Sequence, residues 1–192
     1  MNGANKKENI LNIPNFLTIL RLFLVPVFIF SMIKGYLFVT FILFFIAAAT
    51  DTLDGFIARQ FKIQTDFGRF IDPAADKILM TTAYITFTIK QPALSFTIPI
   101  WLTLIVVGRD ILIVSGCWVL QVFNRALIVD PIKIGKICTF SQVLTIFLLI
   151  LFNLYGKDNI IFQISVLLTA VLTAYSGYAY VKSGMKQLED NA

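Results

Sequence analysis

Four aspartates form two pairs at helical spacing in a largely apolar sequence. Asp51 and Asp54 are three residues apart, and Asp72 and Asp76 are four apart, so each pair shares one face of a helix. Four carboxylates brought together in a low dielectric repel one another unless cations neutralise them. Because the chain contains no histidine and oxygen ligands favour hard divalent ions, these aspartates are predicted to hold two Mg²⁺ or Mn²⁺ ions.

Very small residues accompany the aspartates at the same helical spacing. Gly55 and Ala58 follow Asp54, and Gly68 precedes Asp72 by four residues. Such positions let a large ligand approach the helix backbone, and a diphosphate bound at the metals, with its nucleoside against these residues, fits both space and charge. Asp66 stands at an expected helix start, where an aspartate typically caps the helix, so it is left out of the site.

The segments that must position these residues are membrane helices. The chain has 192 residues, of which 58% are hydrophobic, and a mean hydropathy of +0.83, which predicts an integral membrane protein. Apolar stretches close to the roughly 20 residues that a membrane-spanning helix needs predict an all-α, polytopic fold with six transmembrane helices. The expected spans are about 15–33, 36–59, 66–89, 100–123, 134–155 and 159–181. No linker is evident, so residues 1–192 are expected to form a single membrane domain.

The basic residues predict the orientation of the chain. With six spans, only Lys34, Lys90 and Lys157 of the 16 basic residues fall on the side opposite to the termini. Since cytoplasmic flanks carry the excess of Lys and Arg, the termini and the acidic segment are expected on the cytoplasmic side. The net charge of +5 would face anionic membrane lipids and substrates, and nucleic acid is not expected as a partner. The absence of histidine excludes Ser-His-Asp hydrolysis and histidine-ligated zinc.

The acidic segment from Asp51 to Asp76 reads DxxDGxxAR, eight residues, then GxxxDxxxD. It resembles the signature of the CDP-alcohol phosphatidyltransferase family, whose members join an alcohol to the phosphate of a CDP-linked lipid and release CMP. The resemblance implies that the four aspartates bind two metals, that Asp76 is also the general base, and that the protein is a homodimer. The residues that it implies around the CDP moiety are Gly55, Ala58, Arg59 and Gly68.

The N-terminal segment NIPNFLTILR, residues 12–21, resembles the opening of the phosphatidylglycerophosphate synthases of that family. This resemblance implies CDP-diacylglycerol as the donor and glycerol 3-phosphate as the acceptor. Asn15, Thr18 and Arg21 follow one another at three-residue steps, so all three could face the nucleotide. Alternatively, the segment is an interfacial helix start with Pro14 in its first turn.

Basic residues in the second half of the chain are candidates for binding the acceptor. Arg109 lies inside the fourth expected span, and Lys133 and Lys136 lie at the start of the fifth. A cation at membrane depth needs an anion, which the phosphate of the acceptor would supply. The alternatives are that Arg109 pairs with Asp110 or with one of the clustered aspartates, and that a lysine extends to the membrane surface.

Two other functions compete with this interpretation. The Arg109-Asp110 pair and the spacing of Lys136, Thr139 and Gln142 also resemble the cardiolipin synthases of the same family, whose acceptor is phosphatidylglycerol. A divalent-cation transporter would need polar residues that reach the far side of the membrane, whereas the acids here cluster near one end. Phosphatidyl transfer to glycerol 3-phosphate is therefore preferred, with cardiolipin synthesis as the alternative.

Overall fold

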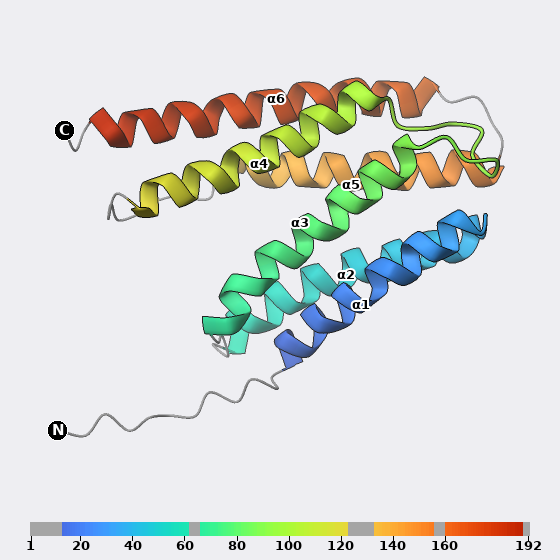
Figure 1. Cartoon of the computed structure of the whole chain (residues 1–192), viewed down its shortest axis with the longest axis horizontal. Helices are drawn as coiled ribbons and strands as arrows, with labels where there is room; N and C mark the ends of the chain where they lie inside the picture. Colours follow the sequence, from blue (N-terminus) through green and yellow to red (C-terminus); the bar gives the residue numbers. More distant parts are fainter. Residues whose placement is uncertain (1–12, 62–65, 123–132, 156–159, 190–192) are drawn as a thin grey trace. The chain divides into compact units, whose positions relative to one another are not determined.

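A computed structural model describes the backbone of residues 13–61, 66–122, 133–155 and 160–189, and the side chains of residues 19–50, 77–116, 134–155 and 160–185. Within these ranges the secondary structure consists of helices, without a strand, which confirms the all-α prediction (Figure 1). The helices are α1 (Ile13–Ile33), α2 (Leu37–Phe61), α3 (Asp66–Thr88), α4 (Ile100–Val122), α5 (Lys133–Tyr155) and α6 (Ile160–Glu189). Their ends agree with the expected spans to within about two residues, apart from the end of α6.

Helix α6 continues to Glu189, beyond the expected end of its span at residue 181. Lysine and glutamine are good helix formers although they are not apolar, so the helix extends past its hydrophobic part. In the described part of the chain, the segments long and apolar enough to cross a membrane are Ile134–Tyr155 and Ile160–Met185. Shorter apolar segments occupy Ile19–Ile33 of α1 and Leu37–Thr50 of α2.

The chain divides into two compact units, Met1–Thr82 and Ala83–Ala192. In the first unit, α1 packs against α2, and buried Val25, Ala47 and Leu79 form a hydrophobic cluster. These residues come from α1, α2 and α3, so the cluster fixes the register of three helices. The expectation of a single domain stays a prediction.

A tight turn at Gly35 lets α2 fold back along α1. Gly35 has a φ of 76°, in the left-handed region that glycine adopts without a Cβ penalty. The backbone N–H of Tyr36 donates to the carbonyl of Ser31 at 3.0 Å, and that of Gly35 donates to the carbonyl of Met32 at 2.9 Å. This is the Schellman arrangement, which satisfies the last carbonyls of α1. A hydrogen bond of 2.9 Å between the hydroxyls of Ser31 and Thr40 also links the two helices.

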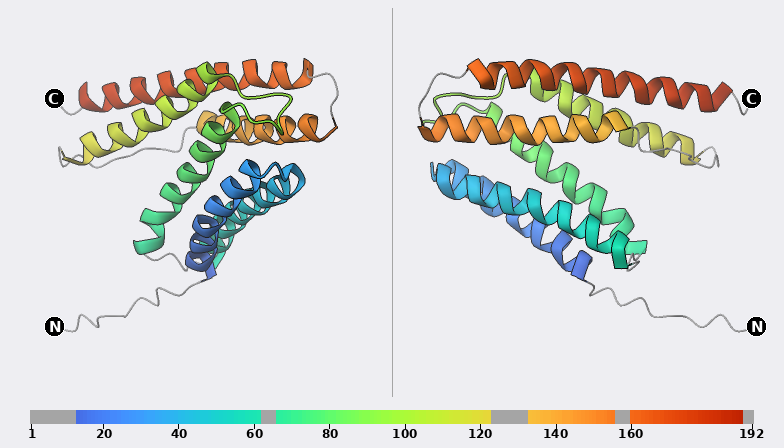
Figure 2. Two further views of the ribbon diagram at one scale, coloured as in Figure 1. Left: turned by 45° about the vertical axis from the view of Figure 1, so that its right-hand side comes forward. Right: turned by 180° about the vertical axis from the view of Figure 1, so that it is seen from behind.

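In the second unit, α6 packs against both α4 and α5, and Figure 2 shows α5 and α6 side by side. A row of buried hydroxyls lies between α5 and α6. The hydroxyl of Thr169 is hydrogen-bonded to those of Ser141 and Thr145, and Thr145 also donates to the carbonyl of Ser165 at 3.3 Å. Hydrogen bonds between apolar helices give each polar group a partner and fix the register of the pair.

The connection between α3 and α4 is held by Asn153 near the end of α5. Its Oδ1 accepts hydrogen bonds from the backbone N–H groups of Ser95 and Phe96, at 2.7 and 3.0 Å, and its Nδ2 donates to the carbonyl of Phe96 at 3.0 Å. One side chain therefore satisfies several backbone groups of a loop that lacks regular structure of its own.

Candidate active site

The aspartates of the motif lie on two consecutive helices. Asp51 and Asp54 fall in the C-terminal half of α2, and Asp72 and Asp76 fall in the N-terminal half of α3. This placement confirms that the motif spans two helices joined by a short connection. Their side chains lie outside the described residues, as do those of Gly55, Ala58, Arg59 and Gly68. Their metal-binding, nucleotide-binding and general-base roles therefore stay predictions.

The hydrophobic cluster of the first unit shows where Asp51 and Asp76 lie along their helices. Asp51 follows the buried Ala47 by four residues, and Asp76 precedes the buried Leu79 by three. At about 1.5 Å per residue, the two positions lie roughly 6 and 4.5 Å from the cluster, measured along the axes of their helices. The end of α2 and the start of α3 lie at the same end of this unit (Figure 2), so both positions lie in the same direction from the cluster.

The first turns of α1 contain Asn15 and Thr18, whose side chains are outside the described residues. The next position in this three-residue series, Arg21, is described and is fully buried, with 0% of its surface exposed. Arg21 precedes Val25 of the hydrophobic cluster by one turn. The sequence analysis named Arg21 together with Asn15 and Thr18 as a residue that could face the nucleotide, and this role stays a prediction.

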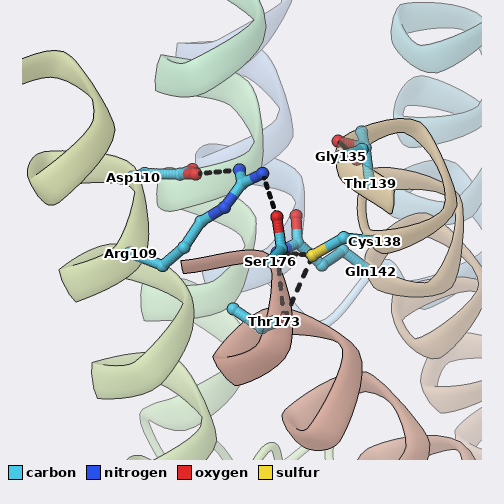
Figure 3. Close-up of polar contacts among 8 residues, drawn as sticks. All are labelled: Arg109, Asp110, Gly135, Cys138, Thr139, Gln142, Thr173 and Ser176. Atoms are coloured by element: carbon cyan, nitrogen blue, oxygen red, sulfur yellow. Dashed lines mark hydrogen bonds and ion pairs between the residues drawn. The ribbon is translucent and has the colours of Figure 1, made fainter. Parts of the chain in front are cut away.

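The second unit contains a buried polar cluster centred on Arg109 of α4 (Figure 3). Its Nη1 donates to Oδ1 of Asp110 at 2.8 Å, and its Nη2 donates to Oγ of Ser176 on α6 at 2.8 Å. The side chains of Arg109 and Asp110 are 6% and 7% exposed. A buried ion pair that is also hydrogen-bonded to a third group holds the guanidinium in one orientation.

Aromatic and backbone contacts complete the surroundings of this guanidinium. The Cζ atom of Arg109 lies 5.5 Å from the ring centroid of Tyr180, within cation–π range. A Cβ atom on Gly135 of α5 would lie 3.2 Å from the Tyr180 hydroxyl and 3.6 Å from Nη2 of Arg109. A Cβ on Gly177 would lie 3.6 Å from Cγ of Arg109. Helices α4, α5 and α6 thus converge on one side chain, and Gly135 permits the close approach of α5.

The residues predicted to bind the acceptor therefore have different environments. Arg109 is paired with Asp110, which was the structural alternative to acceptor binding. Its Nε atom has no hydrogen-bond partner in the described part of the chain. Lys136 is exposed, and Lys133 is the first residue of α5, with its side chain outside the described residues. The acceptor-binding roles of these three residues stay predictions.

Sequence analysis missed Ser176 and Tyr180 as neighbours of Arg109. Ser176 lies 67 residues from Arg109, and no local spacing connects them. The sequence contains one indirect signal, a stripe of hydroxyl residues at three- or four-residue steps along α6: Ser165, Thr169, Thr173 and Ser176. All four are buried in the structure. Such a polar stripe on an apolar helix indicates a face turned toward other helices.

The helices that carry the acidic motif belong to a known class of enzymes. Residues 11–175 match the family described as CDP-alcohol phosphatidyltransferase. The chain therefore belongs to the CDP-alcohol phosphatidyltransferase family, as the motif predicted, and its members are transferases.

Comparison with individual proteins identifies relatives that match nearly the whole chain. The chain is 36% identical over 185 residues to the CDP-diacylglycerol–glycerol-3-phosphate 3-phosphatidyltransferase of Haemophilus influenzae, a match that covers 94% of this chain and 97% of the relative. Relatives of the same name from Yersinia enterocolitica and Bacillus subtilis are 33% and 29% identical, and each match covers 93% of this chain and 97% of the relative. The similarity therefore extends along nearly the whole length of both partners.

Proposed function

We propose that this protein transfers the phosphatidyl group of CDP-diacylglycerol to glycerol 3-phosphate, giving phosphatidylglycerophosphate and CMP. The observation that carries the proposal is the nearly full-length similarity to relatives whose names specify both substrates. The acidic motif across α2 and α3 supports the donor, because the same motif resembles that of enzymes acting on CDP-linked lipids. These names support glycerol 3-phosphate as the acceptor over the phosphatidylglycerol used by cardiolipin synthases.

The proposed reaction is a substitution at phosphorus. A hydroxyl oxygen of glycerol 3-phosphate attacks the phosphorus that carries the diacylglycerol. The anhydride bond of the donor breaks, and CMP leaves with the bonding electrons. The carboxylate of Asp76 accepts the proton of the attacking hydroxyl, as a base within reach of the acceptor can do.

The chemistry of the four motif aspartates suits a site for divalent metal ions. Asp51, Asp54, Asp72 and Asp76 provide oxygen ligands only, and the chain contains no histidine, a donor set that favours Mg²⁺ or Mn²⁺. We propose that these four aspartates hold two such ions. When bound, the ions supply positive charge to the diphosphate. The small residues Gly55, Ala58 and Gly68, together with Arg59, Asn15 and Thr18, are proposed to bind the nucleotide.

The helix lengths support a polytopic membrane protein with six spans. The helices contain 21 to 30 residues, enough to cross a hydrocarbon layer of about 30 Å. The distribution of basic residues supports termini and an active site on the cytoplasmic side. Labelling of single cysteines placed at Lys34 and at Lys182 tests this topology: the two should react from opposite sides, and reaction from one side would contradict it. The homodimer stays a prediction of the family resemblance.

The reaction is tested with the purified protein, CDP-diacylglycerol and one candidate acceptor at a time. Glycerol 3-phosphate should release CMP and form phosphatidylglycerophosphate, whereas serine and inositol should not react. Phosphatidylglycerol is the critical comparison. Cardiolipin as the sole lipid product would replace the proposed acceptor with that of the alternative.

A further inference from the structure

The aromatic ring of Tyr180 lies against the Arg109 guanidinium, and the proposed reaction gives this ring no role. Tyr180 follows Ser176 by four residues, so both lie on one face of α6. Tyr180 is partly buried, whereas Tyr175 and Tyr178 on the same helix are 54% and 62% exposed. The face of α6 that carries Ser176 and Tyr180 is therefore the one turned toward Arg109 of α4.

The hydrogen-bond donors of the guanidinium are unequally used. Arginine has five N–H donors. Nη1 donates to Asp110 and Nη2 donates to Ser176, each at 2.8 Å, but the buried Nε has no hydrogen-bond partner in the part of the chain that the structure describes. A buried donor on a charged group is costly to leave unpaired. An anion that reaches Nε would supply the missing acceptor.

Contacts on three sides limit how the guanidinium can turn. Asp110 and Ser176 hold its two terminal nitrogens, and its Cζ lies over the Tyr180 ring, 5.5 Å from the centroid. Tyr180 is also close to the backbone of α5, because a Cβ atom added to Gly135 would lie 3.2 Å from the tyrosine hydroxyl and 3.7 Å from Cε2 of the same ring. The ring therefore lies close to both Arg109 and the first turn of α5, which restricts its own movement.

We propose that Tyr180 is a positioning residue for the acceptor: its ring holds the Arg109 guanidinium in the orientation in which Nε–H can donate to the acceptor phosphate. The inference rests on the proposed function in one respect, namely that the acceptor carries a phosphate and binds at Arg109. A cation is attracted to the face of an aromatic ring, so less ordering of the arginine side chain is required when the phosphate binds. Tyr180 acts through Arg109 and does not itself contact the substrate.

The test compares glycerol 3-phosphate binding by variants of α6. Binding is measured from the rise in unfolding temperature of the purified protein as glycerol 3-phosphate is added, relative to the same concentration of glycerol, and does not depend on turnover. Tyr180→Leu removes the aromatic face and should weaken binding about three- to tenfold, the range expected for the loss of a cation–π contact. Tyr180→Phe keeps the ring and should bind within about twofold of the wild type. Tyr178→Leu, at an exposed position of the same helix, is the matched control and should also bind within about twofold.

Steady-state kinetics separates positioning from a general loss of structure. With saturating CDP-diacylglycerol, Tyr180→Leu should raise KM for glycerol 3-phosphate by the same factor and leave kcat within about twofold. Equal binding by Tyr180→Leu and Tyr178→Leu, an equal loss in Tyr180→Leu and Tyr180→Phe, or a fall in kcat at unchanged KM would each overturn the proposal. If Tyr180→Leu does not fold, Tyr180→Met takes its place with the same expected results.

The wild-type protein tests the proposed function separately. If it makes cardiolipin and no phosphatidylglycerophosphate, the proposed acceptor is wrong, and the same variants are compared by their KM for phosphatidylglycerol, whose phosphate is also an anion. A rise of that KM in Tyr180→Leu alone would still support the positioning role of the ring, and its absence would overturn it. A wild-type protein that neither binds nor uses either acceptor would overturn both proposals.

Discussion

The buried pair of Arg109 and Asp110 makes a quantitative prediction about stability. Asp110→Asn removes the carboxylate that accepts from Nη1 at 2.8 Å, while the guanidinium stays in an environment where the side chain is only 6% exposed. Breaking a buried pair in this way costs about 3–5 kcal/mol. At about 2–4 °C per kcal/mol for a chain of this length, the unfolding temperature should fall by about 6–20 °C.

Ser176→Ala tests the second contact of the same guanidinium. It removes a hydrogen bond of 2.8 Å from Nη2, and a hydrogen bond to a charged group contributes about 1.5–3 kcal/mol. The expected loss is therefore about 3–12 °C, smaller than the loss for Asp110→Asn. Ser115→Ala is the matched control, because Ser115 is exposed on α4 and donates only to the carbonyl of Leu112, so its effect should stay within about 0.5 kcal/mol.

Thermal unfolding of the three variants in one detergent, followed by intrinsic fluorescence, gives the comparison. The predicted order of the losses is Asp110→Asn, then Ser176→Ala, then Ser115→Ala. If Asp110→Asn unfolds within 2 °C of the Ser115→Ala control, about the shift of a sub-kilocalorie change, the cluster does not stabilise the second unit. The argument from its burial and geometry would then be refuted.

Three further predictions concern the reaction. Chelation of divalent ions should abolish CMP release and added Mg²⁺ or Mn²⁺ should restore it, so full turnover in metal-free buffer would contradict the two-metal site. Asp76→Asn should lower turnover more than nucleotide affinity, whereas the control Asp66→Asn should stay active. An Asp76→Asn protein that loses all affinity for the CDP-lipid but keeps its turnover at saturation would contradict the general-base role. Lys133→Ala and Arg109→Ala should each raise KM for glycerol 3-phosphate by roughly tenfold or more, the loss expected for a charge-assisted contact of about 1.5–3 kcal/mol. KM for the CDP-lipid should change much less. An unchanged KM for glycerol 3-phosphate in both variants would contradict their proposed role in binding the acceptor.

The helices could be predicted from the sequence because hydrophobicity and helix boundaries are local properties. Five helices begin and end within about two residues of the expected spans. The end of α6 was the exception, because hydropathy marks where the apolar part ends, and Lys182 and Lys186 continue the helix without continuing the span. The location of the acidic motif on α2 and α3 was predictable for the same reason, since three- and four-residue spacings indicate one helix face.

Contacts between distant helices could not be predicted in this way. Nothing near Arg109 in the sequence indicates Ser176 or Tyr180, which depend on how α6 packs against α4. Gly135 also appears unremarkable in the sequence, and its closeness to Tyr180 emerges only when α5 is packed beside α6. The burial of Arg21 likewise depends on the packing of its helix. A single sequence contains spacing information along each helix but little about which helix faces meet.

The most direct test of the proposed activity is the stoichiometry of its two products. Purified protein in lipid vesicles that contain CDP-diacylglycerol is supplied with labelled glycerol 3-phosphate, and CMP and labelled lipid are measured together. The account predicts one CMP for each phosphatidylglycerophosphate formed, and no lipid product without the CDP-lipid. CMP release without incorporation of the label, or a label-free cardiolipin as the only product when phosphatidylglycerol is present, would contradict it.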